Sequence, residues 1–541
     1  MEAEALAVNF TPLDWVWTFL LVLLMIICGV LFYRLGKKSE SDFFLAGRGL
    51  PWWLPATSVY ATHTATDTPM WITGTVYQWG ARGVWYPFFA AWTAVSAFVS
   101  TRIFRRSLAM SQAEWQNLRY SGLGAELLRG WLAGWQTFMN MFILAWVSAA
   151  MGKICLYLFL WPEWVGLILF TSICAVYVLA AGYWGVIMAD FQQGVISFVV
   201  ITLVSVWGIH AAGGPQGILE KLDSMDQLWR INPFHFDGFW GLDGSSFYAM
   251  DFITLLVMST LGGLGMGNFI DWYPEAQRIQ SARSVRDASY SMWAGGFISL
   301  ARNSVWVVAI LGFFVLYPGI TEEAEYEMGW FRLGFEYLPA GLVGVFFAGI
   351  IAIHLSTVSS HLNLGALYAT RDLYHHYINP EASQQKLVKM GRISTVLILA
   401  GAFLLGLTMQ SITSWLIFAL WLQAAGIWIP SILQVVWWRF NSWAYLSSWV
   451  ANLVMSWLVV WVLPEIGVLP ELANWANFWL LAVLVSLVYI PVTFLTAPDD
   501  MDHLVKYYVM ARPLGFWGPV RDEASRRGLI GPEKGVEHEA V

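Results

Sequence analysis

The stretch YATHTATDTP, residues 60–69, interrupts a hydrophobic run that is otherwise long enough to cross a lipid bilayer. A similar interruption, GGLGMGNFIDWYP at residues 262–274, falls in a later hydrophobic run. Such breaks in helical hydrogen bonding are tolerated at membrane depth only where the backbone lines a cavity or a site. The two interruptions hold matching places in two successive sets of five spans. The sequence therefore predicts an all-α membrane protein whose core is a 5+5 inverted repeat with broken core helices 1 and 6, a pattern typical of secondary transporters.

The composition indicates the same class of protein. Of the 541 residues, 58% are hydrophobic and only 12% are charged, whereas soluble domains contain about 25% charged residues. Long apolar runs recur from residue 15 to residue 496. Because these runs are continuous rather than alternating, they exclude a large β-barrel. We therefore expect a polytopic bundle of about 13 transmembrane helices.

Hydropathy divides the chain into four parts. We expect a leading transmembrane helix in residues 1–35, a transport core of ten helices in 40–440, two accessory transmembrane helices in 441–496 and a cytoplasmic tail in 497–541. The core helices are expected near residues 51–79, 83–104, 130–158, 162–181, 186–210, 249–274, 288–317, 340–370, 388–409 and 412–437.

The placement of the basic residues predicts the orientation in the membrane. Most Lys and Arg residues of the loops fall on one alternate set of loops, and the other set holds only Arg82, Lys221, Arg230 and Arg332. Since loops rich in Lys and Arg face the cytoplasm, we expect the N-terminus outside and the C-terminus inside a plasma (cytoplasmic) membrane. The tail stretch DHLVKYYVMARPLGFWGPV, residues 502–520, is amphipathic and aromatic, and is predicted to dock on the inner face or to lie at the interface.

Several hydroxyl side chains stand close together in STVSSHLN, residues 356–363, within another apolar run. Ser356, Ser359 and Ser360 share one helix face because they are spaced i, i+3, i+4, and Thr357 lies beside that face. Such hydroxyls can bond back to carbonyls one turn earlier, or let helices pack closely. They can also join carbonyls freed at a broken helix and hold a hard cation such as sodium. We favour the cation site, because a hydroxyl in lipid is costly without a partner.

Asp190 offers a carboxylate that would strengthen a cation site. It lies in AGYWGVIMADFQQG, residues 181–194, near the cytoplasmic start of a predicted span. An acidic side chain there could instead cap the helix N-terminus or face water at the inner leaflet. The residues alone leave both interpretations open.

Four segments of the chain carry motifs: FLAGRGLPWWLPATSVYATHTATDT at residues 44–68, GYWGVIMADFQQ at 182–193, EAQRIQSARSVRDA at 275–288 and STVSSHLNLGALYATRDLY at 356–374. Together they resemble segments of the solute:sodium symporter family, which includes the sodium/glucose, sodium/proline and sodium/sialic acid symporters. The second segment departs from the family in having Met188 and Ala189 where a Trp-Thr pair is usual. The resemblance spans roughly residues 40–440. It implies a leucine-transporter-type fold and sodium-coupled secondary active symport by alternating access.

The resemblance also implies sodium ligands. A first site would use carbonyls at the break of core helix 1 and a carbonyl and two hydroxyls of core helix 8, which here are Ala61, Thr64, Ile353, Ser356 and Thr357. Some members hold a second sodium between an Asp of core helix 5 and Ser residues of core helix 8. Those positions correspond to Asp190, Ser356, Ser359 and Ser360. We therefore expect one sodium ion, and a second if both sites are used.

The sequence defines the solute less well than the ion. Sugar-transporting members of the family have Gln where this chain has Thr68, and Glu on core helix 2, where VWYPFF at residues 84–89 contains no acid. We therefore favour a small polar solute such as an amino acid or a carboxylate over a sugar. Asp67 could face an amine or a water-filled cavity. The residues expected to line the substrate site are Asp67, Thr68, Asn268, Asp271 and Gln423.

Two further polar residues lie within predicted spans. Arg302 needs a partner in the membrane, which Asp271 or a substrate carboxylate could provide. His63 lies inside the first interruption and could tune proton sensitivity or serve in packing.

Other classes of function find less support. The sequence contains no GxxxxGK[ST] loop, so ATP is not expected to drive transport. No nucleophile–base or metal-ligand set points to an enzyme or to a metal other than sodium. We expect the solute, sodium ions and the lipid bilayer as partners, and no nucleic acid. A proton-coupled carrier with Asp67, Asp190 or His63 titrating is the alternative. A transporter-like sensor is less favoured, because a tail of about 45 residues is shorter than a signalling domain of about 100.

Overall fold

The computed structural model describes residues 10–32, 39–85, 93–243, 246–265, 275–409 and 426–530 of the chain. The regular secondary structure in these ranges is helical. Two isolated bridges, Leu50 with Ala282 and Trp437 with Phe516, are the strand-like pairings among the described residues. The all-α class expected from the sequence is thus confirmed for the described part of the chain.

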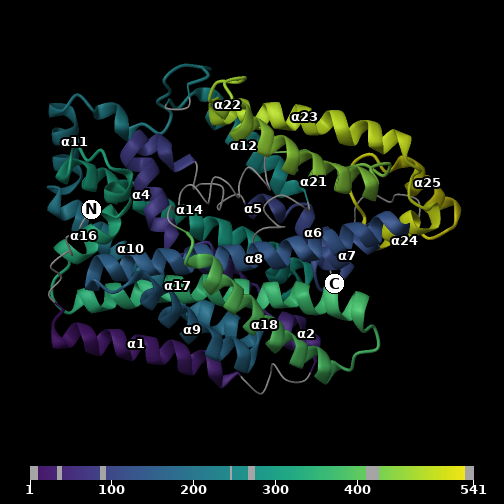
Figure 1. Cartoon of the computed structure of the whole chain (residues 1–541), viewed down its shortest axis with the longest axis horizontal. Coiled ribbons are helices and arrows are strands. Elements are labelled where there is room, and N and C mark those ends of the chain that lie inside the picture. The colour runs from purple at the N-terminus through teal and green to yellow at the C-terminus, as the bar shows by residue number, and fades with distance from the viewer. Residues whose placement is uncertain are drawn as a thin grey trace.

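Eight helical segments within these ranges are long and apolar enough to cross a membrane: α8 (Gly122–Phe159), α9 (Glu163–Ala181), α10 (Tyr183–Ala211), α14 (Val285–Leu316), α17 (Leu342–Leu367) with its extension to Ile378, α18 (Gln384–Gly406), α21 (Ser442–Trp457) with its extension to Glu465, and α23 (Asn474–Leu495). Shorter apolar helices are α1 (Pro12–Leu31) and α12 (Ala249–Leu264). Figure 1 shows α8 and α17 running through the middle of the bundle, with α1 along one edge and α23 along the opposite one. Core helix 10 is described only in its last part, which contains α20 (Trp428–Val436).

The hydrophobic run that contains residues 60–69 forms two helices. α3 (Trp53–Thr62) ends and α4 (Asp67–Trp79) begins within that stretch. The Thr68 Oγ1 accepts a hydrogen bond from the Ala65 N–H at 2.9 Å. A side-chain oxygen thus satisfies a backbone N–H group at the turn between the two helices.

The second interruption expected from the sequence lies between α12 and α13 (Glu275–Ser281). Residues 266–274, which make up most of it, fall outside the described ranges. α13 itself is short and fully buried, and it carries the QR pair of the third motif into the core. The second interruption therefore stays a prediction, but the segment that follows it is well defined.

Core helix 2 differs from the continuous span expected at residues 83–104. Its described parts are η3 (Gly80–Trp85), α5 (Thr93–Ser96) and α6 (Ser100–Ser107). Residues 97–99 form a turn, and the Ser100 Oγ donates to the carbonyls of Ser96 and Gly263 at 3.3 and 2.9 Å. A hydroxyl that bonds to nearby carbonyls competes with helical hydrogen bonds. The expectation of one unbroken helix is therefore wrong at this turn, because hydropathy does not register that competition.

α17 lies at the centre of the bundle and has nearly all of its side chains buried (Figure 1). α1 packs directly against its N-terminal end. The Asp14 carboxylate accepts hydrogen bonds from the N–H groups of Gly341 and Gly344 at 2.9 and 2.7 Å, which satisfies donors that have no partner within the helix. Gly344 permits the close approach, because a Cβ there would lie 2.1 Å from the Asp14 carbonyl oxygen.

The tail is docked against the core beside α6 and α7 (Gln112–Arg119). α24 (Met501–Ala511) and α25 (Gly518–Arg526) bury aliphatic and aromatic side chains in a cluster that they share with these two helices. The Arg119 guanidinium lies 4.7 Å from the centroid of the Trp517 ring, a distance typical of a cation–π contact. The amphipathic tail stretch therefore packs on protein.

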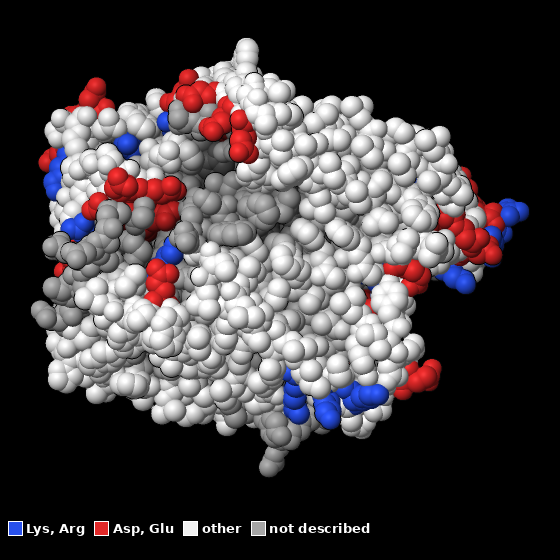
Figure 2. Space-filling model, viewed as in Figure 1, with Lys and Arg blue, Asp and Glu red and all other residues white. Residues whose placement is uncertain are grey.

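Charged side chains are unevenly spread over the face seen in Figure 2. Asp, Glu, Lys and Arg residues occur both at the end that carries α11 (Gly214–Ser224) and α16 (Gly329–Tyr337) and at the end that carries α24 and α25 (Figures 1 and 2). A wide uncharged area lies between the two ends, as expected of a surface that faces lipid tails.

Candidate functional site

The hydroxyl-bearing face of α17 points at α3 and α10, and its side chains are buried. The Ser356 Oγ donates to Asp190 Oδ1 at 2.8 Å, and the Thr357 Oγ1 donates to the Thr62 carbonyl at 3.0 Å. The Ser360 Oγ lies 3.4 Å from Asp190 Oδ2. These three hydroxyls therefore reach across helices, and the alternative that they only bond back within their own helix does not hold for them.

Ser359 behaves differently from its neighbours. Its Oγ donates to the Ser356 carbonyl at 3.0 Å, within the same helix. This is the local bond expected of Ser and Thr in membrane helices. The structure therefore does not bring the Ser359 hydroxyl to the Asp190 carboxylate, although the two were expected in one ligand set.

The residues of the predicted first sodium site lie where α17 passes the end of α3. Thr357 Oγ1 lies 3.0 Å from the Thr62 carbonyl oxygen and 3.5 Å from that of Ile353. The Ala61 carbonyl accepts a hydrogen bond from the Thr64 N–H at 3.1 Å. A hydroxyl and several carbonyls thus gather at a helix break, which is the donor set that a hard monovalent cation prefers. Thr62 was not among the predicted ligands, although its carbonyl makes the closest contact to Thr357.

The residues of the predicted second site meet around the Asp190 carboxylate, which is 0% exposed. Ser58 of α3 also donates a short hydrogen bond to Asp190 Oδ2. Both carboxylate oxygens therefore face hydroxyl donors from neighbouring helices. A buried carboxylate needs such bonds and a positive charge to offset its loss of hydration. The alternative that Asp190 caps its helix or faces water at the inner leaflet does not fit this burial.

The positive charge comes from Arg278 of α13, a residue to which the sequence analysis gave no role. Its Nη2 lies 3.0 Å from Asp190 Oδ2, and both side chains are 0% exposed. Its Nε donates to the Ser58 Oγ at 2.9 Å, and its Nη2 also donates to the Thr62 Oγ1 at 2.9 Å and to the Ser360 Oγ. One signal could have identified Arg278: an acid at membrane depth requires a counter-charge, and Arg278 is the basic residue of the QR motif.

Arg302 of α14 lies against the break between α3 and α4. Its Nη1 donates to the His63 carbonyl at 2.8 Å and to the Thr64 Oγ1, and it lies 5.7 Å from the centroid of the Tyr60 ring. No carboxylate contacts Arg302 among the described residues, and its expected partner Asp271 lies outside them. The arginine therefore holds the broken segment through a carbonyl and a hydroxyl.

His63 is paired with an acid that the sequence analysis did not name. Its Nε2 lies 2.9 Å from Glu275 Oε1, and both side chains are 3% exposed. Glu275 begins α13, so this pair links the break in core helix 1 to the segment that follows the second interruption. Of the two roles left open for His63, proton sensitivity or packing, the contact with an acidic side chain favours the first.

The predicted substrate residues are only partly described. Asp67 begins α4, and its Oδ1 is buried without a hydrogen-bond partner among the described residues. The Thr68 Oγ1 accepts from the Ala65 N–H at 2.9 Å. Asn268, Asp271 and Gln423 lie outside the described residues. Of the two described members, Asp67 therefore has the oxygen better placed to accept a ligand donor.

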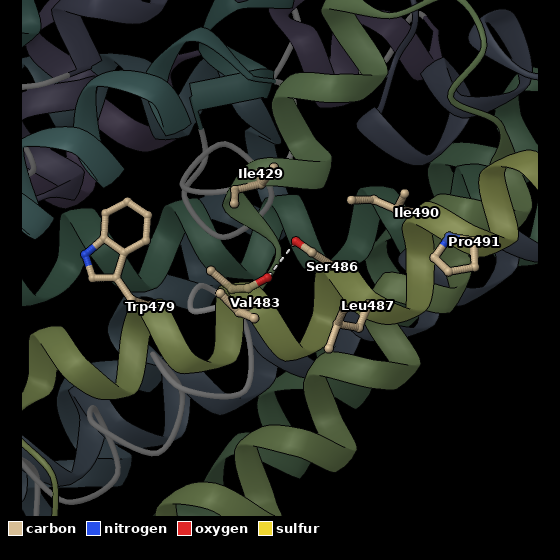
Figure 3. Close-up of a pocket in the computed structure, with 8 residues that line it drawn as sticks. Ile429, Trp479, Val483, Ser486, Leu487, Ile490 and Pro491 are labelled. Atoms are coloured by element: carbon tan, nitrogen blue, oxygen red, sulfur yellow. Dashed lines mark hydrogen bonds between the residues drawn. The ribbon is translucent and has the colours of Figure 1, made fainter.

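A separate pocket of about 320 Å³ lies between α20 and α23 (Figure 3). It is lined by Ile429, Trp479, Ala482, Val483, Ser486, Leu487, Ile490 and Pro491. Its hydroxyl is already used, because the Ser486 Oγ donates to the Ala482 carbonyl at 2.6 Å. The pocket contains none of the predicted ion or substrate residues and is a mostly apolar hollow between the last part of core helix 10 and the accessory helix α23.

Comparison with known proteins identifies the family to which this chain belongs. Residues 43–451 match the family described as the sodium:solute symporter family, a family of transporters rather than enzymes. A sodium/glucose cotransporter of Vibrio parahaemolyticus is 25% identical over 402 residues, covering 68% of this chain and 69% of that protein. An osmoregulated proline transporter of Bacillus subtilis is 25% identical over 327 residues, covering 60% of this chain and 63% of the transporter.

The fold also resembles that of a sodium-coupled sialic acid symporter in a substrate-bound, outward-open state. The TM-score is 0.74 at 17% identity, and the match covers 91% of this chain and all of the symporter. At that identity the likeness concerns the fold alone. The family match spans most of the chain, including the helix break and the α10, α13 and α17 residues that surround it. This protein is a member of the sodium:solute symporter family.

Proposed function

We propose that this protein carries a small polar organic solute across the plasma membrane together with sodium, by alternating access. Membership of the family supports sodium use. The observation that carries the proposal is the Thr357 hydroxyl of α17, buried 3.0 Å from the Thr62 carbonyl where α3 ends. A hydroxyl opposite freed carbonyls is suited to a monovalent hard cation, because neutral oxygens can replace part of its hydration shell.

The sodium ligands that we propose for the first site are those expected from the sequence: Ala61, Thr64, Ile353, Ser356 and Thr357. Their support is the contact between α17 and the end of α3, which gathers carbonyl and hydroxyl oxygens from two helices. Neutral oxygens of this kind replace the hydration shell of an ion without fixing it too tightly to leave. We do not propose a second sodium ion at the set expected around Asp190, because the Arg278 guanidinium already lies 3.0 Å from that carboxylate.

For the solute we propose an amino acid or another carboxylate. Asp67 supports the amine end, since its Oδ1 is buried without a hydrogen-bond partner among the described residues. Thr68, Asn268, Asp271 and Gln423 complete the proposed lining. The named relatives are described as carriers of glucose and proline, and their range leaves the solute class to be decided by experiment.

We further propose that residues 40–440 form a 5+5 inverted repeat in which core helices 1 and 6 are both broken. Residues 1–35 would add a leading helix, residues 441–496 two accessory helices and residues 497–541 the tail. The N-terminus would face outside and the C-terminus the cytoplasm. The gathering of Lys and Arg residues in one alternate set of loops supports this orientation.

Uptake of labelled solutes into proteoliposomes, with and without an inward sodium gradient, tests the proposed function. We expect one solute class to accumulate only with sodium, and potassium not to replace it. A proton-coupled carrier is the second candidate, which the buried 2.9 Å contact between His63 Nε2 and Glu275 Oε1 at the helix break favours. Equal uptake in sodium-free buffer under a proton gradient would establish that candidate instead.

A further inference from the structure

We propose that Arg278 is a built-in cation that takes the place of a second sodium ion at Asp190, so that the protein binds one sodium ion rather than two. The inference rests on the proposed sodium-coupled transport and specifies the number of sodium ions that each protein molecule binds. It concerns the cluster formed by Asp190, Arg278, Ser58, Thr62 and Ser360, which we call the arginine cluster.

The first argument is occupancy. The Arg278 Nη2 lies 3.0 Å from Asp190 Oδ2 and 2.9 Å from the Thr62 Oγ1, and it also donates to the Ser360 Oγ. The Nε donates to the Ser58 Oγ at 2.9 Å. Carboxylate and hydroxyl oxygens from α3, α10 and α17 therefore all point at one guanidinium. These lone pairs are the ones that a sodium ion on the Oδ2 side of Asp190 would need, whereas Oδ1 accepts from the Ser356 Oγ.

The second argument is charge. Asp190 and Arg278 are each 0% exposed and together are neutral. In a site of low dielectric constant, a sodium ion added to this pair would place two positive charges beside one negative charge, at a cost that water cannot offset. A second ion and the guanidinium are thus mutually exclusive at Asp190. The first site carries no such conflict, because its proposed ligands are neutral oxygens.

The third argument is that Arg278 is held firmly in place. The neighbouring Gln277 Nε2 donates to the Phe44 carbonyl at 2.7 Å and to the Asn363 Oδ1 of α17 at 2.6 Å. The Arg278 guanidinium also lies 5.5 Å from the centroid of the Tyr183 ring. To free Asp190, α13 would have to withdraw the arginine from three helices at once. The pair is therefore a structural ion pair between helices, and not a surface contact that sodium can displace by mass action.

The number of sodium ions bound per molecule tests this inference without knowledge of the solute. Equilibrium binding of radioactive sodium is measured on the purified full-length protein, with potassium holding the ionic strength constant. We expect wild type to bind one ion. Arg278→Gln leaves the Asp190 charge unpaired and removes its competitor, so it should bind two. The double variant Asp190→Asn/Arg278→Gln has no charge left at the cluster and should return to one.

Arg129→Gln provides a matched control, because Arg129 forms another buried pair, with Asp372, at 2.8 Å. The same loss of an arginine charge there should leave the count at one. Should Arg278→Gln fail to fold, the wild-type count still tests the inference, because a count of two would overturn it.

Two results would overturn the inference. A wild-type count of two shows that sodium and Arg278 coexist or that the arginine leaves. A count of one in folded Arg278→Gln shows that the arginine does not exclude a second ion. Failure of the proposed function looks different: wild type would then bind no sodium at all, or bind it with an affinity that Thr357→Val leaves unchanged.

Discussion

Replacing Thr357 by Val tests the proposed sodium site most directly, because it removes one hydroxyl and nearly keeps the shape of the side chain. Thr357 is 3% exposed, and its Oγ1 lies 3.0 Å from the Thr62 carbonyl at the end of α3. Carbonyls at a helix end have no partner within the helix, so the variant leaves this one without its donor. We expect the free energy of unfolding to fall by about 1–3 kcal/mol.

The variant should weaken sodium binding by more than the loss of a hydrogen bond between neutral groups would, because the lost partner of the hydroxyl is an ion. Interactions of a hydroxyl with a charged group contribute about 1.5–3 kcal/mol, which corresponds to roughly a 10- to 150-fold increase in the Kd for sodium. Titration of the purified protein with radioactive sodium measures this change. Thr357→Ser, which keeps the hydroxyl and loses only a methyl group, is the control and should bind sodium nearly as wild type does.

The difference in sodium Kd between the two variants decides whether the Thr357 hydroxyl is a sodium ligand. If Thr357→Val and Thr357→Ser bind sodium with equal affinity, the hydroxyl is not a ligand and its contact with Thr62 is packing alone. A lower melting temperature combined with an unchanged sodium Kd leads to the same conclusion.

Further predictions concern the ion, the fold and the response to pH. At fixed pH, solute uptake should rise with sodium and not with potassium, as measured by the initial rate in proteoliposomes; a rate independent of sodium contradicts the coupling. Gly344→Ala should lower the melting temperature, because its Cβ would lie 2.1 Å from the Asp14 carbonyl oxygen, and overpacking of this kind costs about 1–3 kcal/mol; an unchanged melting temperature would mean that α1 can shift freely. Burial raises the pKa of Glu40 from 4.5 to about 7, against the lowering effect of Arg371. The folded protein therefore binds this proton more tightly than the unfolded chain, and its stability should fall as the pH rises from about 4.5 to 7, by about 1.4 kcal/mol per unit of pKa difference. Denaturation midpoints across that window should lose this slope in Glu40→Gln, and an identical slope in both proteins would assign it to other groups.

Local sequence patterns predicted the position of the helix break and the helix face on which Ser356 and Ser360 lie. The polar, proline-containing stretch at residues 60–69 falls where α3 ends and α4 begins. The spacing of Ser356 and Ser360 correctly placed both on the face that meets Asp190. These features depend on helical periodicity and on the cost of polar groups in lipid, and both can be read from neighbouring residues.

Contacts between residues far apart in the sequence could not be predicted from local patterns. Arg278 lies 88 residues from Asp190 along the chain, and no periodicity connects them. The turn after Ser96 escaped notice because it depends on a bond from Ser100 to the Gly263 carbonyl on another helix. Ser359 was grouped with its neighbours by spacing, yet its hydroxyl bonds within its own helix. For Arg278 the partner comes from tertiary packing, whereas for Ser359 a local bond within the helix competes with the predicted one.

The arginine at Asp190 has a consequence for how steep a concentration difference this protein can maintain. One sodium ion moving down a tenfold gradient and a potential of 100 mV supplies about 3.7 kcal/mol, enough to accumulate a neutral solute roughly 500-fold. A second ion would square that ratio. An arginine remains attached to the protein through every cycle and contributes nothing to the gradient that drives uptake. A carrier that keeps its own cation in this position would therefore use less sodium for each solute molecule, and would suit a nutrient that is dilute but not scarce.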